Sequence, residues 1–261
     1  MNLRQALLKV AWVAPIIVGL GWSAVALAQS SASAPPPALD QAADTILAKA
    51  CQTLGAADAF SFHADVMFDQ VLPGAVKVQY GGAMDYAVQR PGRLAIVYRS
   101  DLGGKDLWYG NSSLTLFDPR YGMYATIAVP PTIDAMLDQV ADKHGLTMPL
   151  SDLVYSNPCA RPKKLAVYSG YLGVNPVEGV PCDHLALSSS KDDFQIWIDH
   201  TGKPLPRKIV INHRSEPGSP EYIAILSGWK FPKDIASSRF QPQLPKDAKQ
   251  IAFIKAEEAK P

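Results

Sequence analysis

The sequence predicts a mainly β protein (α+β), built as a single strongly curved antiparallel sheet with helices that plug its concave face. Apolar and polar residues alternate with a period of two over most of the chain after residue 59, which is typical of strands with one apolar face. Turn residues separate these runs and favour an antiparallel meander. Two stretches, 40–54 and 132–144, carry apolar residues at helical spacing, and these stripes need a sheet face to pack against.

The N-terminal segment 1–28 has the organisation of a secretory signal peptide. Arg4 and Lys9 precede an apolar run over 10–27, which ends in an Ala-Leu-Ala triplet of the kind that signal peptidase cuts. An uncleaved anchor helix is the alternative, but a spanning helix needs about 20 consecutive apolar residues, and proline and glycine interrupt this run. We therefore expect export and cleavage after Ala28, which leaves no stable membrane anchor.

The rest of the chain divides into a linker, one folded domain and a tail. Residues 29–38 are small residues and prolines, which predicts a flexible linker. The polar residues 255–261 predict a tail that frays. A single domain is expected over 39–254, because a mostly β domain of this length is common.

Local signals place the elements of this domain. Asp40 is positioned to cap the helix 40–54. Gly81-Gly82 interrupts an alternating run and predicts a bulge or a sharp bend. A short helix is expected over 149–155, followed by a loop over 157–164. The expected strands are 60–69, 76–80, 84–88, 94–98, 107–109, 114–117, 124–127, 165–171, 182–188, 194–199, 207–213 and 222–229.

Composition and motifs exclude several function classes. The 25 Lys+Arg against 24 Asp+Glu give a net charge of +1, so no basic face for nucleic acid is expected. The five histidines are scattered singly, without metal-ligand spacing, and we expect neither a metal nor a cofactor. There is no Gly-x-Ser-x-Gly and no phosphate loop. An enzyme is therefore not expected, since no nucleophile has a positioned base.

The three cysteines allow one disulfide in an oxidising compartment. Cys159 and Cys182 lie near the ends of elements in the same half of the chain, and they are the expected pair. Three separate buried thiols are the alternative. Cys51, the first cysteine, lies more than 20 residues after the apolar run, too far for lipid attachment.

Four stretches, in order along the chain, resemble the periplasmic lipoprotein carriers of the LolA/LolB-like half-barrel superfamily. Over nearly the whole mature chain, the sequence is similar to an uncharacterised family of predicted periplasmic proteins in that superfamily. The resemblance implies a periplasmic location, an open half-barrel, and a hydrophobic small molecule or a lipidated protein as partner. The four stretches are Phe62-His63-Ala64, 82–94 with its Arg90-Pro91-Gly92 turn, 108–111 with 116–119, and 195–199 with 202–207.

Arg90 falls on the hairpin arginine of the carriers, which the resemblance associates with holding and releasing the lipoprotein. The alternative is a structural role, in which Arg90 pairs with a helix-end carbonyl or with Asp85. The chain departs from the carriers by an extra helical segment over 130–157, so transfer of lipoproteins does not follow from the resemblance alone.

Two functions remain open. The first is non-catalytic binding of a lipid, an acyl chain or a lipidated peptide by a carrier-like monomer. The second is a solid-cored interaction or sensor module that binds a protein partner. For the first function, alternation predicts an apolar lining of the concave face that supplies affinity, and Arg90 or polar groups at the rim would orient the ligand. The expected ligand-binding residues are Phe60, Phe62, Val66, Phe68, Val78, Tyr80, Tyr86, Arg90, Leu94, Ile96 and Tyr98.

Overall fold

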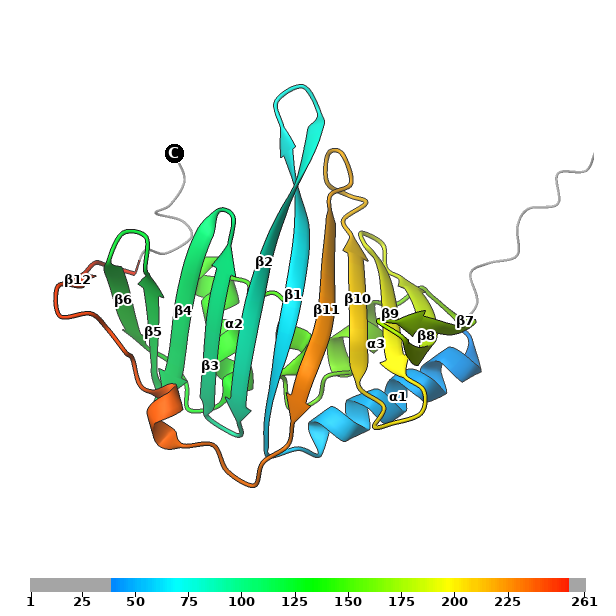
Figure 1. Ribbon diagram of the computed structural model, residues 1–261, viewed down its shortest axis with the longest axis horizontal. Helices are drawn as coiled ribbons and strands as arrows, with labels where there is room; N and C mark the ends of the chain where they lie inside the picture. The colour runs from blue at the N-terminus through cyan, green and yellow to red at the C-terminus, as the bar shows by residue number, and fades with distance from the viewer. Residues whose placement is uncertain (1–38, 254–261) are drawn as a thin grey trace, which may run out of the picture. The chain divides into compact units, whose positions relative to one another are not determined.

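The computed structural model describes residues 39–253, which form one 12-stranded sheet with three α-helices packed on one of its faces (Figure 1). The expected signal peptide, linker and polar tail lie outside the described residues. The strands are β1 (Ala59–Leu72), β2 (Val76–Gln89), β3 (Arg93–Ser100), β4 (Gly103–Gly110), β5 (Ser113–Asp118), β6 (Met123–Ala128), β7 (Tyr168–Val177), β8 (Val180–Ser188), β9 (Asp193–Asp199), β10 (Pro206–Asn212), β11 (Glu221–Lys230) and β12 (Lys249–Gln250). The helices are α1 (Gln41–Gly55), α2 (Ile133–His144) and α3 (Ala160–Leu165), with the 3-10 turns η1 (Ser151–Leu153) and η2 (Ser237–Phe240).

The sheet consists of two antiparallel meanders joined side by side. The strand order is β12-β6-β5-β4-β3-β2-β1-β11-β10-β9-β8-β7, so the first meander meets the second where β1 pairs with β11. Among the strands of residues 39–253, the short β12 alone pairs in parallel, with β6, and an isolated parallel bridge joins Leu39 to Ser169. The end strands β12 and β7 do not pair with each other, so the sheet stays open. This arrangement confirms the predicted fold class.

We call the face that carries the helices the inner face. It contains the alternate β1 residues Phe60, Phe62, Ala64 and Val66, which are buried. The outer face carries the intervening residues, such as His63 and Asp65. Because side chains alternate along a strand, the same rule assigns every strand of the sheet to these two faces.

α1 begins where the sequence predicts and packs on the second meander. The Asp40 side chain accepts a hydrogen bond from the Ala42 backbone N–H at 2.8 Å, which caps the helix. Its buried stripe lies against inner-face residues of β8 and β9, including Leu185 and Ile198. The residues of that stripe are Ala43, Leu47, Ala50 and Leu54.

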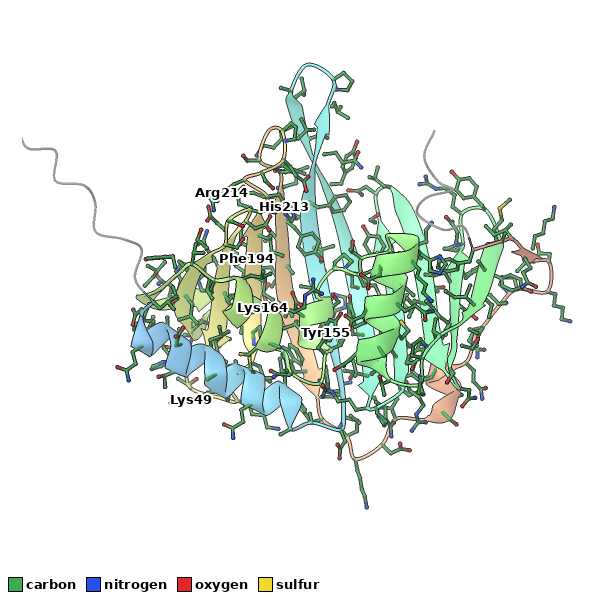
Figure 2. The ribbon with its side chains drawn as sticks, turned by 180° about the vertical axis from the view of Figure 1, so that it is seen from behind. Lys49, Tyr155, Lys164, Phe194, His213 and Arg214 are labelled. Atoms are coloured by element: carbon green, nitrogen blue, oxygen red, sulfur yellow. A yellow bond between two sulfur atoms is a disulfide. The ribbon has the colours of Figure 1, made fainter. Side chains whose placement is uncertain are left out.

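α2 packs on the first meander. Thr132 caps its N-terminus, and Gly145 ends it with a left-handed backbone (φ 61°), a conformation that favours glycine. Its buried residues join the core formed by β1 to β5, whose strands lie behind the helix in Figure 2. They are Ile133, Met136, Leu137 and Val140. Within residues 39–253, no helix has the length and apolar character that spanning a membrane requires.

The structure differs from the sequence prediction in three elements. The register of β1 and β2 runs without a shift past Gly81 and Gly82, so the expected bulge is absent from this pairing. Gly82 instead permits close packing, since a Cβ there would lie 2.6 Å from the Arg99 carbonyl oxygen. The expected loop over 157–164 contains α3, and the expected helix over 149–155 is reduced to η1.

The chain after β11 returns across the outer face of the first meander. Phe240 of η2 is buried there against Ala95, Trp108 and Phe117. The segment then ends in β12 at the edge of the sheet (Figure 1). Alternation did not predict this segment, because its contacts are made by irregular chain.

The expected disulfide pairing is wrong. Cys51 of α1 is bonded to Cys159, just before α3, and Cys182 is a buried free thiol. Cys182 packs on the outer face with Trp197 and Val210, whereas Cys159 packs with Leu47 beneath α1. The sheet therefore lies between Cys159 and Cys182.

Candidate functional site

The inner face contains an apolar cavity of about 270 Å³ beneath α1 and α3. Figure 2 looks onto this face and shows Phe194 between Lys164 of α3 and the loop that carries His213 and Arg214. The cavity extends along β8, β9 and β10 of the second meander. Its lining residues are Leu47, Ala50, Cys51, Leu54, Leu150, Asp152, Leu153, Pro158, Arg161, Leu165, Ala166, Leu187, Ser188, Ser189, Asp192, Phe194, Ile196, Ile198, Pro206, Ile209 and Ile211.

The walls of the cavity come from four parts of the chain. α1 supplies the helical stripe that the sequence predicts, and the strands supply alternate aliphatic residues such as Ile209 and Ile211. The segment around η1 supplies Leu150 and Leu153. α3 supplies the fourth wall, and its Leu165 is 54% exposed although it lines the cavity, so this residue reaches both the cavity and the solvent.

The Cys51–Cys159 disulfide connects two of these walls. Cys51 itself lines the cavity, and Cys159 immediately precedes α3. The sulfur of Cys159 also lies 3.7 Å from the Leu47 carbonyl oxygen. The pair therefore holds the helix α1 and the start of α3 against each other.

The sequence-predicted ligand-binding residues lie elsewhere, and none of them lines this cavity. Tyr98 is partly buried against the core beneath α2. Phe68, Val78 and Tyr80 are half-exposed toward the end of the β1–β2 hairpin. The remaining six apolar residues form a packed core, each no more than 5% exposed: Phe60, Phe62, Val66, Tyr86, Leu94 and Ile96.

Aromatic stacking fills the centre of this core. The ring of Phe62 stacks on Tyr86 at a centroid distance of 4.6 Å and on Trp229 at 4.5 Å. The Tyr86 hydroxyl donates to the Pro149 carbonyl oxygen, which joins the core to the chain before η1. The first half of the inner face is consequently solid, and the hollow lies in the second half.

Arg90 binds backbone carbonyls at the end of α1. Its Nη1 donates to the Leu54 and Ala57 carbonyl oxygens, and its Nη2 donates to those of Val154 (3.2 Å) and Tyr155 (2.7 Å). Burial lowers the pKa of this guanidinium below its ordinary value. The structure therefore realises the helix-end alternative for Arg90, which does not line the cavity.

His63 carries the one raised histidine pKa resolved in the described part of the chain, and it lies on the outer face. Its Nδ1 is 2.8 Å from Asp85, and this hydrogen bond raises the pKa of the imidazole; a longer contact to Asp65 adds to the effect. Within residues 39–253, no three metal-ligating side chains are grouped so that they could hold a metal ion.

The sequence contained part of the signal for the cavity. Phe194, Ile196 and Ile198 alternate as regularly as the residues of β1, and Ile209 and Ile211 continue the pattern. Alternation identifies residues that share a face, but it does not tell a filled face from a hollow one. α3 was not expected at all, so the position of the cover could not be predicted.

The fold and the cavity define the chain as an open-sheet protein with helices on one face and an apolar hollow beneath two of them. The sequence model of the family described as "Predicted periplasmic protein (DUF2092)" matches residues 43–254. The chain belongs to this family, and the protein is periplasmic, as the export signal predicted. No curated protein matches the chain.

Solved structures with similar folds share little sequence with this chain. Lipoprotein LppX from Mycobacterium tuberculosis is 14% identical, with 75% of this chain and 98% of that chain covered and a TM-score of 0.46. LprF from Mycobacterium bovis is 13% identical (81% and 100% covered, TM-score 0.46). The LolA superfamily protein NE2245 from Nitrosomonas europaea is 10% identical (77% and 97% covered, TM-score 0.37).

Proposed function

We propose that this protein binds an apolar ligand, without catalysis, in the cavity between α1, α3 and β8–β10. The ligand class is a lipid, an acyl chain or a lipid-modified peptide. The observation that carries the proposal is the apolar hollow of about 270 Å³ in an otherwise packed inner face. Ligand sites are concave and mostly apolar, with a few polar groups near the entrance.

The size of the hollow supports a bound guest. An apolar hollow of about 270 Å³ leaves its lining side chains without the packing contacts that a filled core would give them. An apolar cavity of about 150 Å³ already binds benzene in another protein. A guest that fills this larger cavity would restore the missing contacts.

A carrier-like role follows from the compartment and the cover. An apolar molecule in the periplasm is surrounded by water, and burial of each methylene contributes about 0.8 kcal/mol. α3 is only six residues long, and its last residue, Leu165, is half-exposed. Displacement of this short helix would open the cavity without disturbing the sheet.

A solid-cored interaction module is the second candidate. It is supported by the edge strand β7, where Leu172 is 50% exposed and Val174 is 46% exposed. An exposed apolar edge is a common place for a partner to add a strand. The hollow under α1 has no role in this alternative.

Ligand uptake tests the proposal and separates the two candidates. We expect N-phenyl-1-naphthylamine to bind the purified protein with a rise in its fluorescence. Ile211→Trp fills the cavity from β10 and should weaken binding at least about tenfold, which corresponds to 1.4 kcal/mol. Ile225→Trp is the matched control, because Ile225 is partly buried on the outer face of the neighbouring β11. Absence of binding, or equal loss in both folded variants, would contradict the proposal and favour the interaction module.

A further inference from the structure

The polar groups of the cavity are few. Sixteen of the 21 lining residues are apolar or cysteine. The five polar lining residues lie on α3, on η1 and at the end of β8 with the turn that follows it. They are Asp152, Arg161, Ser188, Ser189 and Asp192.

The two serines among them already have partners within the protein. The Ser189 hydroxyl accepts from the Asp192 backbone N–H at 2.9 Å and donates to the Asp192 carbonyl oxygen at 3.2 Å. The Ser188 hydroxyl donates to Asp193 at 2.6 Å and accepts from Arg214 at 3.1 Å. A ligand would have to break these bonds to gain a hydrogen bond from either hydroxyl.

The two arginines near these residues are each engaged by a carboxylate. Arg214 lies 2.9 Å from Asp193, and Arg161 lies 3.8 Å from Asp152 and stands over the ring of Tyr155. Asp192 lies 2.9 Å from Nδ1 of His213, which carries a charge only when it is protonated. Neither arginine is therefore free to bind an anionic headgroup.

The cavity is long in the direction of the strands. It follows β10 from Pro206 to Ile211, and five residues of strand span about 17 Å at ~3.4 Å per residue. A volume of about 270 Å³ spread over that length favours a slender guest over a fused-ring or two-chain guest.

We propose that the ligand is a single unbranched acyl chain, which the protein recognises by its length and not by its headgroup. This inference rests on the proposed function. The chain lies along β10, and the headgroup stays in water beyond the paired residues of the entrance. Affinity then comes from apolar burial alone, so it rises by about fourfold for each methylene buried, which is ~0.8 kcal/mol converted at 25 °C.

Displacement of N-phenyl-1-naphthylamine by two series of ligands, each below its micelle concentration, tests this inference. In the chain series from octanoate to palmitate, we expect affinity to rise about fourfold per methylene and then to level off when the cavity is full. In the headgroup series of laurate, monolaurin and dodecyltrimethylammonium, we expect dissociation constants that agree within about threefold, which is less than 1 kcal/mol.

A charge-reversal variant provides the electrostatic control. Lys164 of α3 is exposed, is seen near Phe194 of the cavity wall in Figure 2, and does not itself line the cavity. Lys164→Glu should leave the affinity for laurate unchanged. A difference above about tenfold between laurate and monolaurin, or a large loss in Lys164→Glu, would overturn headgroup independence while the proposed function stands. If no ligand of either series displaces the probe from the cavity, the proposed function itself fails.

Discussion

The guanidinium of Arg90 joins the β2–β3 turn to the end of α1 and to the segment that follows η1. It donates to carbonyl oxygens at the end of α1 and in the segment that follows η1, and it stands 5.1 Å from the centroid of the Phe60 ring. A cation at a helix C-terminus interacts favourably with the exposed carbonyls there. Arg90 therefore joins segments that are 36 and 65 residues away from it in sequence.

Removal of this side chain tests whether its role is structural. Arg90→Leu leaves four carbonyl oxygens without their donor, and we expect a loss of about 3–5 kcal/mol in the free energy of unfolding, measured by urea denaturation. Arg93→Leu, at the start of β3, is the matched control, because Arg93 lies 3.5 Å from the exposed Asp234 and stands over the Phe240 ring, and none of its contacts is to a helix-end carbonyl. It should cost about 1 kcal/mol or less.

Unchanged stability in Arg90→Leu would contradict this structural role. If Arg90→Leu is as stable as the parent and releases bound ligand at a different rate, Arg90 acts in ligand handling, as the resemblance to the carriers implies. The present geometry predicts lower stability with unchanged affinity in the protein that remains folded.

The cysteines show what residue patterns can and cannot predict. Alternation along β8 already places Cys182 on the face opposite Leu185 and Leu187. Which cysteine reaches Cys51 depends on where α1 crosses the sheet, and that position is a tertiary property. Proximity in sequence was therefore a poor guide to the pairing.

Among the elements, the helices with caps and the alternating strands were predictable from local chemistry. α2, for example, has a threonine cap at its start and a glycine at its end. α3 was not predictable in this way, because its six residues are too few to show a helical period. η2 and β12 depend on contacts with β3–β6, which no local pattern encodes.

The disulfide between α1 and the start of α3 should keep the cavity covered. The double variant Cys51→Ser/Cys159→Ser opens a loop of 108 residues, and we expect a loss of about 2–5 kcal/mol in the free energy of unfolding. We also expect faster dissociation of a bound fluorescent acyl chain in stopped-flow experiments, since α3 is then free of α1.

Cys182→Ala is the control for this experiment, because that thiol is buried on the outer face. It should leave the dissociation rate unchanged. If the double variant releases the chain no faster than the control, the disulfide contributes only to the stability of the fold, and the cover opens by another route.

At the scale of the molecule, the two halves of the inner face differ. Beneath α2 the face is solid, since Met136 and Val140 of the helix complete a core with the aromatic residues of β1 and β2. Beneath α1 and α3 it contains the cavity. The sequence predicted an apolar inner face with helices over it, but both halves satisfy that description. Only the positions of the helices determine which half is filled.

Photoaffinity labelling tests this division directly. A palmitate that carries a diazirine near the end of its chain would be bound to the protein, activated with light, and its adducts mapped by mass spectrometry of peptides. We predict adducts on residues of the second meander that line the cavity, such as Leu187, Phe194 and Ile209. Adducts on Phe62 or Tyr86 of the first meander, with none on β8–β10, would contradict the account.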